Sequence, residues 1–111
     1  QLDKRGNNKN GLKDGIWEYF NENGQLESRE NWIDGKQDGL VETYYNNGKL
    51  RKKGNIRNKE NSGLWEYFYE NGQLEFKGHY KNGEPDGLWE KFDEEGNLLT
   101  IGEYKDGELI E

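Results

Sequence analysis

The sequence contains no cysteine, no methionine, one proline, one histidine and no long apolar run. The absence of cysteine excludes a disulfide framework, a thiolate metal site and a cysteine nucleophile. No apolar segment approaches the roughly 20 residues that a membrane-spanning helix requires. Lysine and arginine number 16 against 23 aspartate and glutamate residues, which gives a net charge of −7. This acidic balance disfavours nucleic-acid binding, because phosphate contacts require a basic surface.

Apolar residues are also scarce. Hydrophobic residues make up 29% of the chain and the mean hydropathy is −1.40, values close to those of disordered proteins. Aromatic residues nevertheless make up 14% and recur at fixed positions, which a disordered chain has no reason to maintain. We therefore expect an elongated folded structure, because a thin repeat array needs less core than a globule of the same length.

The chain has an internal period of 24 residues. Three columns keep this period: Gly15, Gly39, Gly63 and Gly87; Gly24, Gly48, Gly72 and Gly96; and Leu2, Leu26, Leu50, Leu74 and Leu98. A further column comprises Gly6, Gly54, Gly78 and Gly102, with Glu30 as the exception. A fixed period of this length indicates stacked supersecondary units.

The period divides the chain into one domain of consecutive units. We predict a partial repeat at residues 1–14 and full repeats at 15–38, 39–62, 63–86 and 87–111. Because the chain opens in the middle of a repeat, we expect it to be a fragment or a processed product.

Each unit has the pattern of a β-hairpin. In the third unit two aromatic-rich runs flank Asn71-Gly72, and Asn-Gly is the strongest short signal for a two-residue type I′ turn. A large indole across a glycine would be an instance of aromatic rescue. The turn predicts these facing pairs on one side of the hairpin: Trp65 with Gly78, Tyr67 with Phe76, and Tyr69 with Leu74.

On the other side of the hairpins, the same arithmetic brings opposite charges together. Each pair contributes about 0.2–1 kcal/mol. Equivalent glutamates two strands apart would lie about 10 Å from each other, beyond the roughly 5–9.5 Å of glycosidase carboxylates, so we interpret them as structural. The predicted pairs are Glu18 with Arg29, Glu42 with Lys53, and Glu66 with Lys77, whereas Glu90 meets Ile101.

Hairpins joined by short turn-rich segments predict an all-β fold. Tandem 24-residue hairpins would form a single elongated, twisted antiparallel meander sheet. Helix is not expected, because glycine arrives too often for three uninterrupted helical turns.

One face of this sheet should be rich in aromatic side chains. Such a face could be a groove for a peptide strand or a sugar chain, or the core of a thin sheet, which is the interpretation we favour. A single-layer sheet would also leave part of the face exposed, so the same residues are the candidate partner-binding site. They are Trp17, Tyr19, Tyr45, Trp65, Tyr67, Tyr69, Phe76, Tyr80, Trp89 and Tyr104.

No catalytic, metal or cofactor site is predicted. The acidic stretch Asp93-Glu94-Glu95 lacks the alternating ligand spacing of a calcium loop, and we interpret it as a solvated turn. His79 has no serine or cysteine nucleophile that the pattern places beside it, and we expect it to be exposed.

The third unit resembles the MORN-repeat-variant family of bacteria, whose units read approximately Gly-Leu-Trp-x-x-Tyr-Tyr-x-Asn-Gly-x-Leu-x-x-x-Gly-x-Tyr-x-x-Gly. The resemblance covers essentially the whole chain, with departures at Val41, Ile56, Glu30 and Trp32. It implies a protein-interaction scaffold and, for many relatives, the antitoxin component of a toxin–antitoxin pair. The lipid contacts of related eukaryotic repeats transfer poorly, because anionic headgroups would repel this acidic chain. The matching residues are Gly63-Leu64-Trp65-Glu66-Tyr67-Phe68, Asn71-Gly72-Gln73-Leu74 and Gly78-His79-Tyr80-Lys81-Asn82-Gly83.

These observations favour a non-enzymatic β-repeat module that binds another protein. Open sheet edges would also allow strand addition by a partner or self-association. The alternative is a carbohydrate- or cell-wall-binding module, because aromatic hairpins with Trp-x-Tyr-Phe also resemble choline-binding repeats. Val41 in place of tryptophan weakens that alternative, and an enzyme is the third class. The compartment, cytoplasmic or exported after removal of a leader, stays open.

Overall fold

The computed structural model describes residues 3–110, and within them every regular element is a β-strand. Gln1, Leu2 and Glu111, at the ends of the first and last predicted units, lie outside the described residues. The strands are β1 Lys4–Arg5, β2 Asn8–Lys9, β3 Leu12–Lys13, β4 Gly15–Phe20, β5 Leu26–Ile33, β6 Lys36–Tyr44, β7 Leu50–Arg57, β8 Glu60–Phe68, β9 Leu74–Lys81, β10 Glu84–Phe92, β11 Leu98–Lys105 and β12 Glu108–Ile110.

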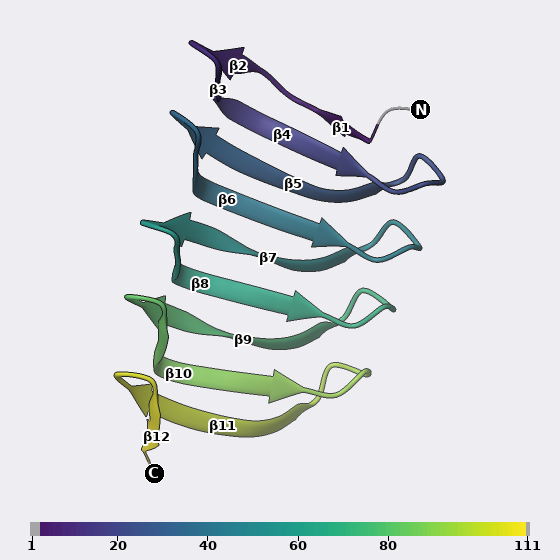
Figure 1. Cartoon of the computed structure of the whole chain (residues 1–111). Coiled ribbons are helices and arrows are strands. Elements are labelled where there is room, and N and C mark those ends of the chain that lie inside the picture. Colours follow the sequence, from purple (N-terminus) through teal and green to yellow (C-terminus); the bar gives the residue numbers. More distant parts are fainter. Residues whose placement is uncertain (1–2, 111) are drawn as a thin grey trace.

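Ten of these strands form one antiparallel sheet in chain order, from β1 through β4 to β12, and β2 and β3 pair with each other. The sheet is a single curved layer, with the longer hairpin loops on one side and the tight two-residue turns on the other (Figure 1). Its Cα atoms span 48 × 31 × 14 Å. The predicted all-β meander of tandem hairpins is confirmed.

The core is very small, as expected for a single layer. Within residues 3–110, the hydrophobic side chains that are buried are Trp17, Val41 and Trp65, which are 8%, 6% and 2% exposed. All three occupy the same position of the repeat, immediately before the glutamate column. Burial is therefore repeated from unit to unit rather than concentrated at one centre, as in other solenoid-like arrays.

The predicted strand register is correct from Trp65 to Tyr67, but the turn type at Asn71-Gly72 was wrong. Trp65 pairs with Gly78, whereas Gly72 (φ 94°) has positive φ and Asn71 does not. The Gly72 N–H donates to Tyr69 O at 3.0 Å and the Tyr69 N–H donates to Gln73 O at 2.8 Å. This is a three-residue loop with a left-handed glycine and a bulge. Leu74 consequently pairs with Phe68 and not, as predicted, with Tyr69.

Type I′ turns occur instead at the opposite ends of the strands, where one unit joins the next. Asn82 (φ 53°) and Gly83 (φ 81°) both have positive φ, and the flanking Lys81 and Glu84 pair directly. The equivalent turn at Asn58-Lys59 has Lys59 at φ 67°, where an L-residue with a side chain is strained. Three-residue loops within the hairpins thus alternate along the chain with two-residue turns between the units, and both connect antiparallel strands.

A bulge in the first strand of a unit decides where its tryptophan lies. In β10, Asp86 pairs with His79 and Glu90 pairs with Lys77, so three residues of β10 face the single residue Gly78. Bulges re-aim side chains, and here the indole of Trp89 lies on Gly78 of the preceding strand. A Cβ on Gly78 would lie 2.0 Å from Trp89 Cδ2, so no other residue fits beneath this ring.

The same contact repeats along the array and corrects the predicted rescue pairs. A Cβ on Gly54 would lie 2.0 Å from Trp65 Cδ2, and one on Gly6 would lie 2.2 Å from Trp17 Cδ2. Each indole therefore covers the column glycine that precedes it in the chain, in the previous unit, and not its in-register partner within the hairpin. The tryptophans thus connect units to one another.

This contact explains the two exceptions in the repeat pattern. Glu30 stands in the glycine column, and the residue it faces across β5 and β6 is Val41, the one position without tryptophan. A side chain at residue 30 leaves no room for an indole, and the smaller valine occupies the place. Trp17, whose in-register partner is also Glu30, is retained because its indole covers Gly6.

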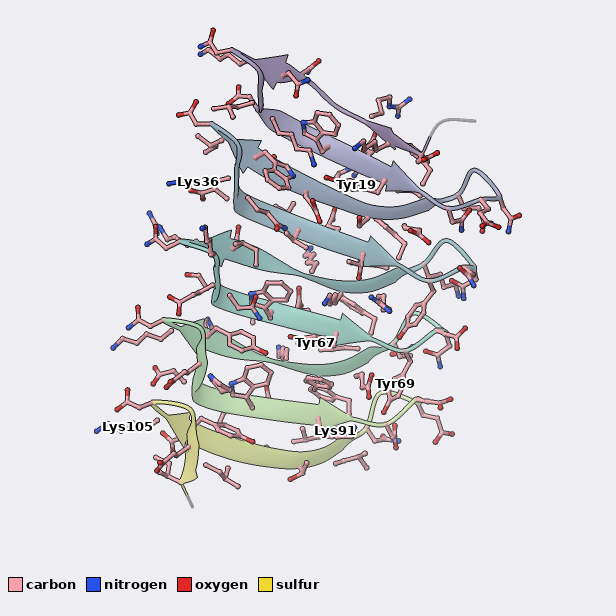
Figure 2. The ribbon with its side chains drawn as sticks, viewed as in Figure 1. Tyr19, Lys36, Tyr67, Tyr69, Lys91 and Lys105 are labelled. Carbon is pink, nitrogen blue, oxygen red and sulfur yellow. The ribbon has the colours of Figure 1, made fainter. Side chains whose placement is uncertain are left out.

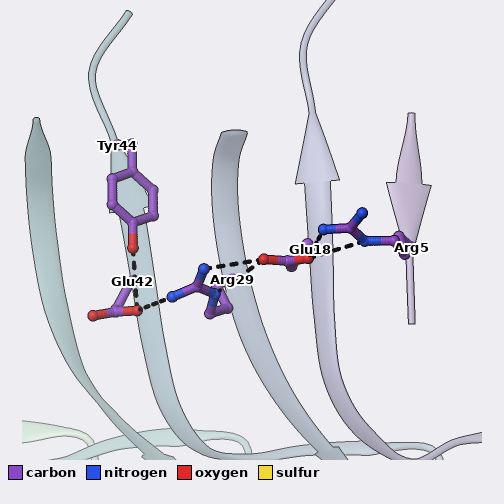
Figure 3. A network of polar contacts seen from close by, with 5 residues as sticks. All are labelled: Arg5, Glu18, Arg29, Glu42 and Tyr44. Atoms are coloured by element: carbon purple, nitrogen blue, oxygen red, sulfur yellow. Dashed lines mark hydrogen bonds and ion pairs between the residues drawn. The ribbon is translucent and has the colours of Figure 1, made fainter. Parts of the chain in front are cut away.

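The opposite face carries an alternating row of charges across eight strands. Glu18 receives hydrogen bonds from Arg5 Nη2 at 2.6 Å and Arg29 Nη2 at 3.0 Å, and Arg29 Nη1 lies 3.4 Å from Glu42 Oε1, as Figure 3 shows. Tyr44 donates to the same Glu42 oxygen at 3.2 Å. Hydrogen bonds from the two arginines hold the pKa of Glu18 below its usual value.

Within this row each basic side chain on β5, β7 and β9 stands between two acidic ones, one in its own hairpin and one in the next unit. The three predicted pairs are in register, and the ion pair at Glu18–Arg29 forms. Lys77 approaches Glu90 of the next unit, with 4.0 Å between Nζ and Oε1. The row therefore links units on this face as the indoles do on the other, and it accounts structurally for the glutamate column.

Candidate functional site

Six of the ten predicted aromatic residues form one continuous cluster over β8 to β11. Tyr67 and Phe76 are stacked with 4.4 Å between ring centroids. The other contacts are Trp65–Tyr67 at 6.2 Å, Trp65–Tyr80 at 6.0 Å, Phe76–Trp89 at 6.1 Å, Tyr80–Trp89 at 5.1 Å and Trp89–Tyr104 at 6.3 Å. Tryptophan and tyrosine rings alternate along the array in edge-to-face contacts.

A groove with a volume of 470 Å³ opens on this cluster, and its walls are mostly apolar. Tyr80 and Tyr104 stand nearly perpendicular to the Trp89 indole, at 84° and 73°. Because the indole lies against Gly78, Trp89 forms the floor of the groove and the two tyrosines form walls. The remaining lining is contributed by Phe76, Pro85, Glu90, Lys91, Thr100, Ile101, Gly102 and Leu109.

The polar groups around the cluster are largely engaged within the protein. The Trp89 Nε1–H donates to His79 O at 3.2 Å, and the hydroxyls of Tyr67 and Tyr80 lie 3.1 Å apart. Burial and that hydroxyl contact raise the pKa of Tyr67 well above its usual value. Lys91 Nζ lies 3.4 Å from Glu75 Oε2. The groove therefore offers ring surface with few free hydrogen-bonding groups.

Trp17 and Tyr19 belong to a second cluster near the N-terminus, which is filled by a lysine. Lys13 Nζ lies 4.9 Å from the Trp17 ring centroid, 5.3 Å from that of Tyr19 and 4.4 Å from that of Trp32. It also donates a hydrogen bond to Tyr19 OH at 2.8 Å. Such cation–π contacts contribute about 0.5–1 kcal/mol each at exposed sites. This surface is occupied by the protein itself.

The last two predicted residues, Tyr45 and Tyr69, lie at the hairpin loops and connect consecutive loops. Tyr69 OH donates to Phe92 O at 2.7 Å, and Tyr45 OH donates in the same way to Phe68 O. In Figure 2, Tyr69 lies toward the loop end of the sheet while Tyr67 lies on the strands. These two tyrosines brace the array and stand apart from the ring cluster.

The second unit separates the two aromatic clusters. Val41, Thr43, Lys52 and Ile56 occupy the positions that Trp65, Tyr67, Phe76 and Tyr80 hold one unit later. The six-ring cluster is therefore confined to the third and fourth units, and its groove has a defined end. The sequence pattern placed all ten aromatic residues on one face, and only the structure separates them into a cluster, a filled site and two loop braces.

Sequence reasoning missed three residues that lie against the rings: Lys13, Pro85 and Leu109. They share one column of the repeat with Gln37 and Asn61. The signal that could have found Pro85 is that the single proline falls in this column, shortly before Trp89. No pattern of hydrophobicity marks the column, because its members differ in chemistry.

Other candidate sites have simple structural roles. His79 is exposed, as expected. Asp93 Oδ1 accepts hydrogen bonds from the backbone N–H groups of Glu95 and Asn97, both at 2.9 Å, and the Asn97 backbone contact lowers its pKa. Among residues 3–110, no group of three His, Cys, Asp or Glu side chains could hold a metal ion, and no helix could cross a membrane.

The repeat pattern of the MORN repeat variant matches residues 13–34, 37–58, 61–82 and 85–106. The chain belongs to the MORN repeat variant family. The four matched segments begin at equivalent points of successive units, which confirms the period found in the sequence. MORN repeats commonly serve as protein- or membrane-interaction modules. No curated protein matches the chain.

Proposed function

We propose that this MORN repeat chain is a non-enzymatic interaction module that binds an extended segment of a protein partner along the aromatic groove of its third and fourth units. The observation that supports this proposal is the open groove of 470 Å³ lined by four rings, Phe76, Tyr80, Trp89 and Tyr104. Rigid aromatic side chains give large contact area at small entropic cost, and they dominate binding at protein interfaces.

The chemistry of the groove favours binding over catalysis. Its charged lining residues are Glu90 and Lys91. Glu90 is directed to Lys77 on the other face of the sheet, and Lys91 is paired with Glu75. Lys91 faces Thr100 across β10 and β11, but its amine is held by Glu75. The groove lining contains no histidine, cysteine or serine, so we assign these residues no acid, base or nucleophilic role.

The carbohydrate alternative finds no support in the arrangement of the rings. Each unit offers one tryptophan position for stacking on a sugar; Trp65 is 2% exposed and the second unit has Val41 there, so Trp89 is the one indole of this cluster left for such stacking. The antitoxin role stays a prediction. It would make the partner a toxin, which the following experiment would identify.

The test is affinity capture with the whole chain immobilised, followed by quantitative mass spectrometry of a lysate of the source organism. Tyr104→Ala removes one groove wall, and Leu64→Ala, 43% exposed on the other face, is the matched control. We expect one protein in stoichiometric amount with the parent chain and with Leu64→Ala, and its loss with Tyr104→Ala. Equal capture by all three, or retention on glycan resin instead, would contradict the proposal.

We also propose that the chain self-associates through a sheet edge at high concentration. Among the described residues, β12 pairs with β11 only at Glu103–Lys105, so the outer edge of β11 from Leu98 to Gly102 has no neighbouring strand. Leu98, Leu99 and Ile101 there are 48%, 56% and 52% exposed. Exposed apolar edges favour strand pairing between molecules. Sedimentation velocity over a concentration series tests this, and a constant monomer would contradict it.

A further inference from the structure

The shape of the groove narrows the chemistry of the segment that fits it. Building on the proposed function, we propose that the occupant is a proline-rich segment in the polyproline II conformation, with basic residues beside the prolines. It runs along the long axis of the sheet, across β9, β10 and β11. Four observations carry this inference: the spacing of the groove walls, the hydrogen-bonding state of the rings, the position of Pro85 and the local charge.

The wall spacing matches the period of a polyproline II helix. Tyr80 and Tyr104 are equivalent residues on β9 and β11, two strands apart, and two strand spacings amount to about 9.6 Å. A polyproline II helix has three residues per turn and rises about 3.1 Å per residue, so equivalent side chains recur about every 9.3 Å. An extended β-strand repeats about every 6.7 Å and fits the walls poorly. Side chains one turn apart, every third residue of the segment, can therefore contact the Tyr80 wall and the Tyr104 wall.

The corner between the Trp89 floor and each tyrosine wall has the geometry that a pyrrolidine ring requires. The Trp89 indole is the floor, and the tyrosine rings are walls that meet it at 84° and 73° with centroids 5.1 and 6.3 Å away. A preformed polyproline II segment loses little entropy on binding and docks on aromatic-lined grooves. The chain's own proline, Pro85, lines this same groove and pairs with Tyr80 across β9 and β10. The surface therefore already accommodates one proline.

The hydrogen-bonding state of the rings also favours proline. Trp89 and Phe76 carry no hydrogen-bond acceptor, and the Tyr80 hydroxyl already has the Tyr67 hydroxyl as its partner, so the ring surface offers few acceptors to backbone N–H groups. An extended peptide of other residues would leave those N–H groups unsatisfied against the rings, at a cost in free energy. Proline has no N–H, and the carbonyls of a polyproline II helix remain accessible to water.

The negative charge of the third and fourth units favours a basic ligand. Residues 63–111 contain 13 aspartates and glutamates against four lysines, and Lys91 is already paired with Glu75. The second unit, residues 39–62, carries six basic residues and two acidic ones and lies beyond the end of the ring cluster. A basic proline-rich segment is therefore attracted to the third and fourth units and is held off the second, which fixes its position along the array.

The experiment measures fluorescence anisotropy with a labelled synthetic peptide of three Pro-Ala-Pro triplets flanked by lysines. The control peptide has serine in place of every proline. We expect the proline peptide to bind the whole chain at least about tenfold more tightly than the serine peptide, with a further loss when glutamates replace the lysines. Tyr104→Ala should weaken binding about tenfold, and Leu64→Ala should leave it unchanged. Equal binding of both peptides would overturn the inference.

Two additions keep the test decisive. Tyr104→Leu keeps apolar bulk but removes the flat wall. A loss of affinity without a change in the circular dichroism spectrum supports contact between proline and the Tyr104 ring, and unchanged affinity contradicts it. Selection from a random peptide library separates this inference from the proposed function. Extended binders that depend on Tyr104 but lack spaced prolines would refute the polyproline ligand and retain the module, whereas helical binders would refute the extended segment as well. Absence of any such binder would refute both.

Discussion

Replacement of Gly54 by alanine tests the contact that joins one unit to the next. The new Cβ would lie 2.0, 2.2 and 2.4 Å from Cδ2, Cε2 and Cγ of Trp65, whereas carbon atoms in contact are normally about 3.5–4.0 Å apart. The obstacle is the fixed part of an indole and not the end of a flexible chain. The whole ring must therefore move to restore a normal separation, and Trp65 loses its contact with β7.

The magnitude follows from the burial of that ring. Trp65 is 2% exposed, and a buried tryptophan removes about 150–250 Å² from water, equivalent to about 4–6 kcal/mol. Partial displacement forfeits part of this, together with the hydrogen bond from Trp65 Nε1 to Asn55 O at 3.1 Å, which contributes about 1 kcal/mol. We expect the free energy of unfolding to fall by about 3–5 kcal/mol, similar to the loss of a large buried aromatic side chain.

The matched control is Gly102→Ala. A Cβ there would lie 3.0 Å from Leu109 Cδ1, a terminal methyl of a side chain that is 58% exposed and free to rotate. The expected change is within about 1 kcal/mol. Urea unfolding followed in parallel by circular dichroism and tryptophan fluorescence provides both values, and coincidence of the two curves justifies a two-state treatment. A loss below about 1 kcal/mol for Gly54→Ala, or equal losses at both glycines, would refute the indole–glycine contact.

Three further changes test other parts of the structure. Lys59→Gly removes a left-handed L-residue and should raise the free energy of unfolding by up to about 1 kcal/mol; a lower urea midpoint would contradict this. Glu30→Gly with Val41→Trp should install the missing contact, with a favourable coupling of about 2 kcal/mol in a double-mutant cycle, and zero coupling would count against it. Arg5→Ala removes a partner that lowers the pKa of Glu18. A depressed carboxyl pKa stabilises the fold above the unfolded value of 4.5 and loses that effect as the pH falls through the folded pKa of Glu18. Parent and variant should therefore differ at pH 7, by under about 1 kcal/mol, and converge once the pH is below that folded pKa. A gap that widens on acidification would be incompatible with this pair.

Much of the fold was predictable because the same pattern recurs in every unit. The columns of glycine, leucine and aromatic residues predicted hairpins, their number and the register of Trp65 with Gly78, all of which the structure confirms. A register error of one residue would have moved every apolar side chain to the other face. Since every unit would suffer the same error, the repeat pattern admits only one consistent pairing.

The turn types were not predictable from the Asn-Gly signal alone. Asn71-Gly72 and Asn82-Gly83 carry the same dipeptide, yet only the second forms a type I′ turn. At Asn71 the side-chain oxygen accepts a hydrogen bond from Gln73 N at 2.9 Å, and its amide donates to Glu94 O of the next loop at 3.0 Å. Contacts between neighbouring loops thus select the conformation, and a single-hairpin rule does not include them.

The glycine beneath each indole was the least accessible feature, although a signal existed. Trp65 has one column glycine before it, Gly54, and another after it, Gly78, so periodicity alone cannot choose between them. The exceptions can: tryptophan is absent at Val41, where the preceding position is Glu30 and the following one is still Gly54, and Trp17 is present with the reverse arrangement. The departures from the repeat held more information on packing than the consensus.

By itself, the amino-acid order determined the strands, their number and their pairing, because these depend on local turn chemistry and on an alternation of side chains that recurs in every unit. Only the tertiary structure decided which side chains became groove and which became scaffold. That choice depends on the bulge in β10 and its equivalents, which turn each indole toward the preceding unit, and on Lys13 filling one aromatic site while the other stays open. Both are contacts between units, which a pattern repeated within each unit cannot express.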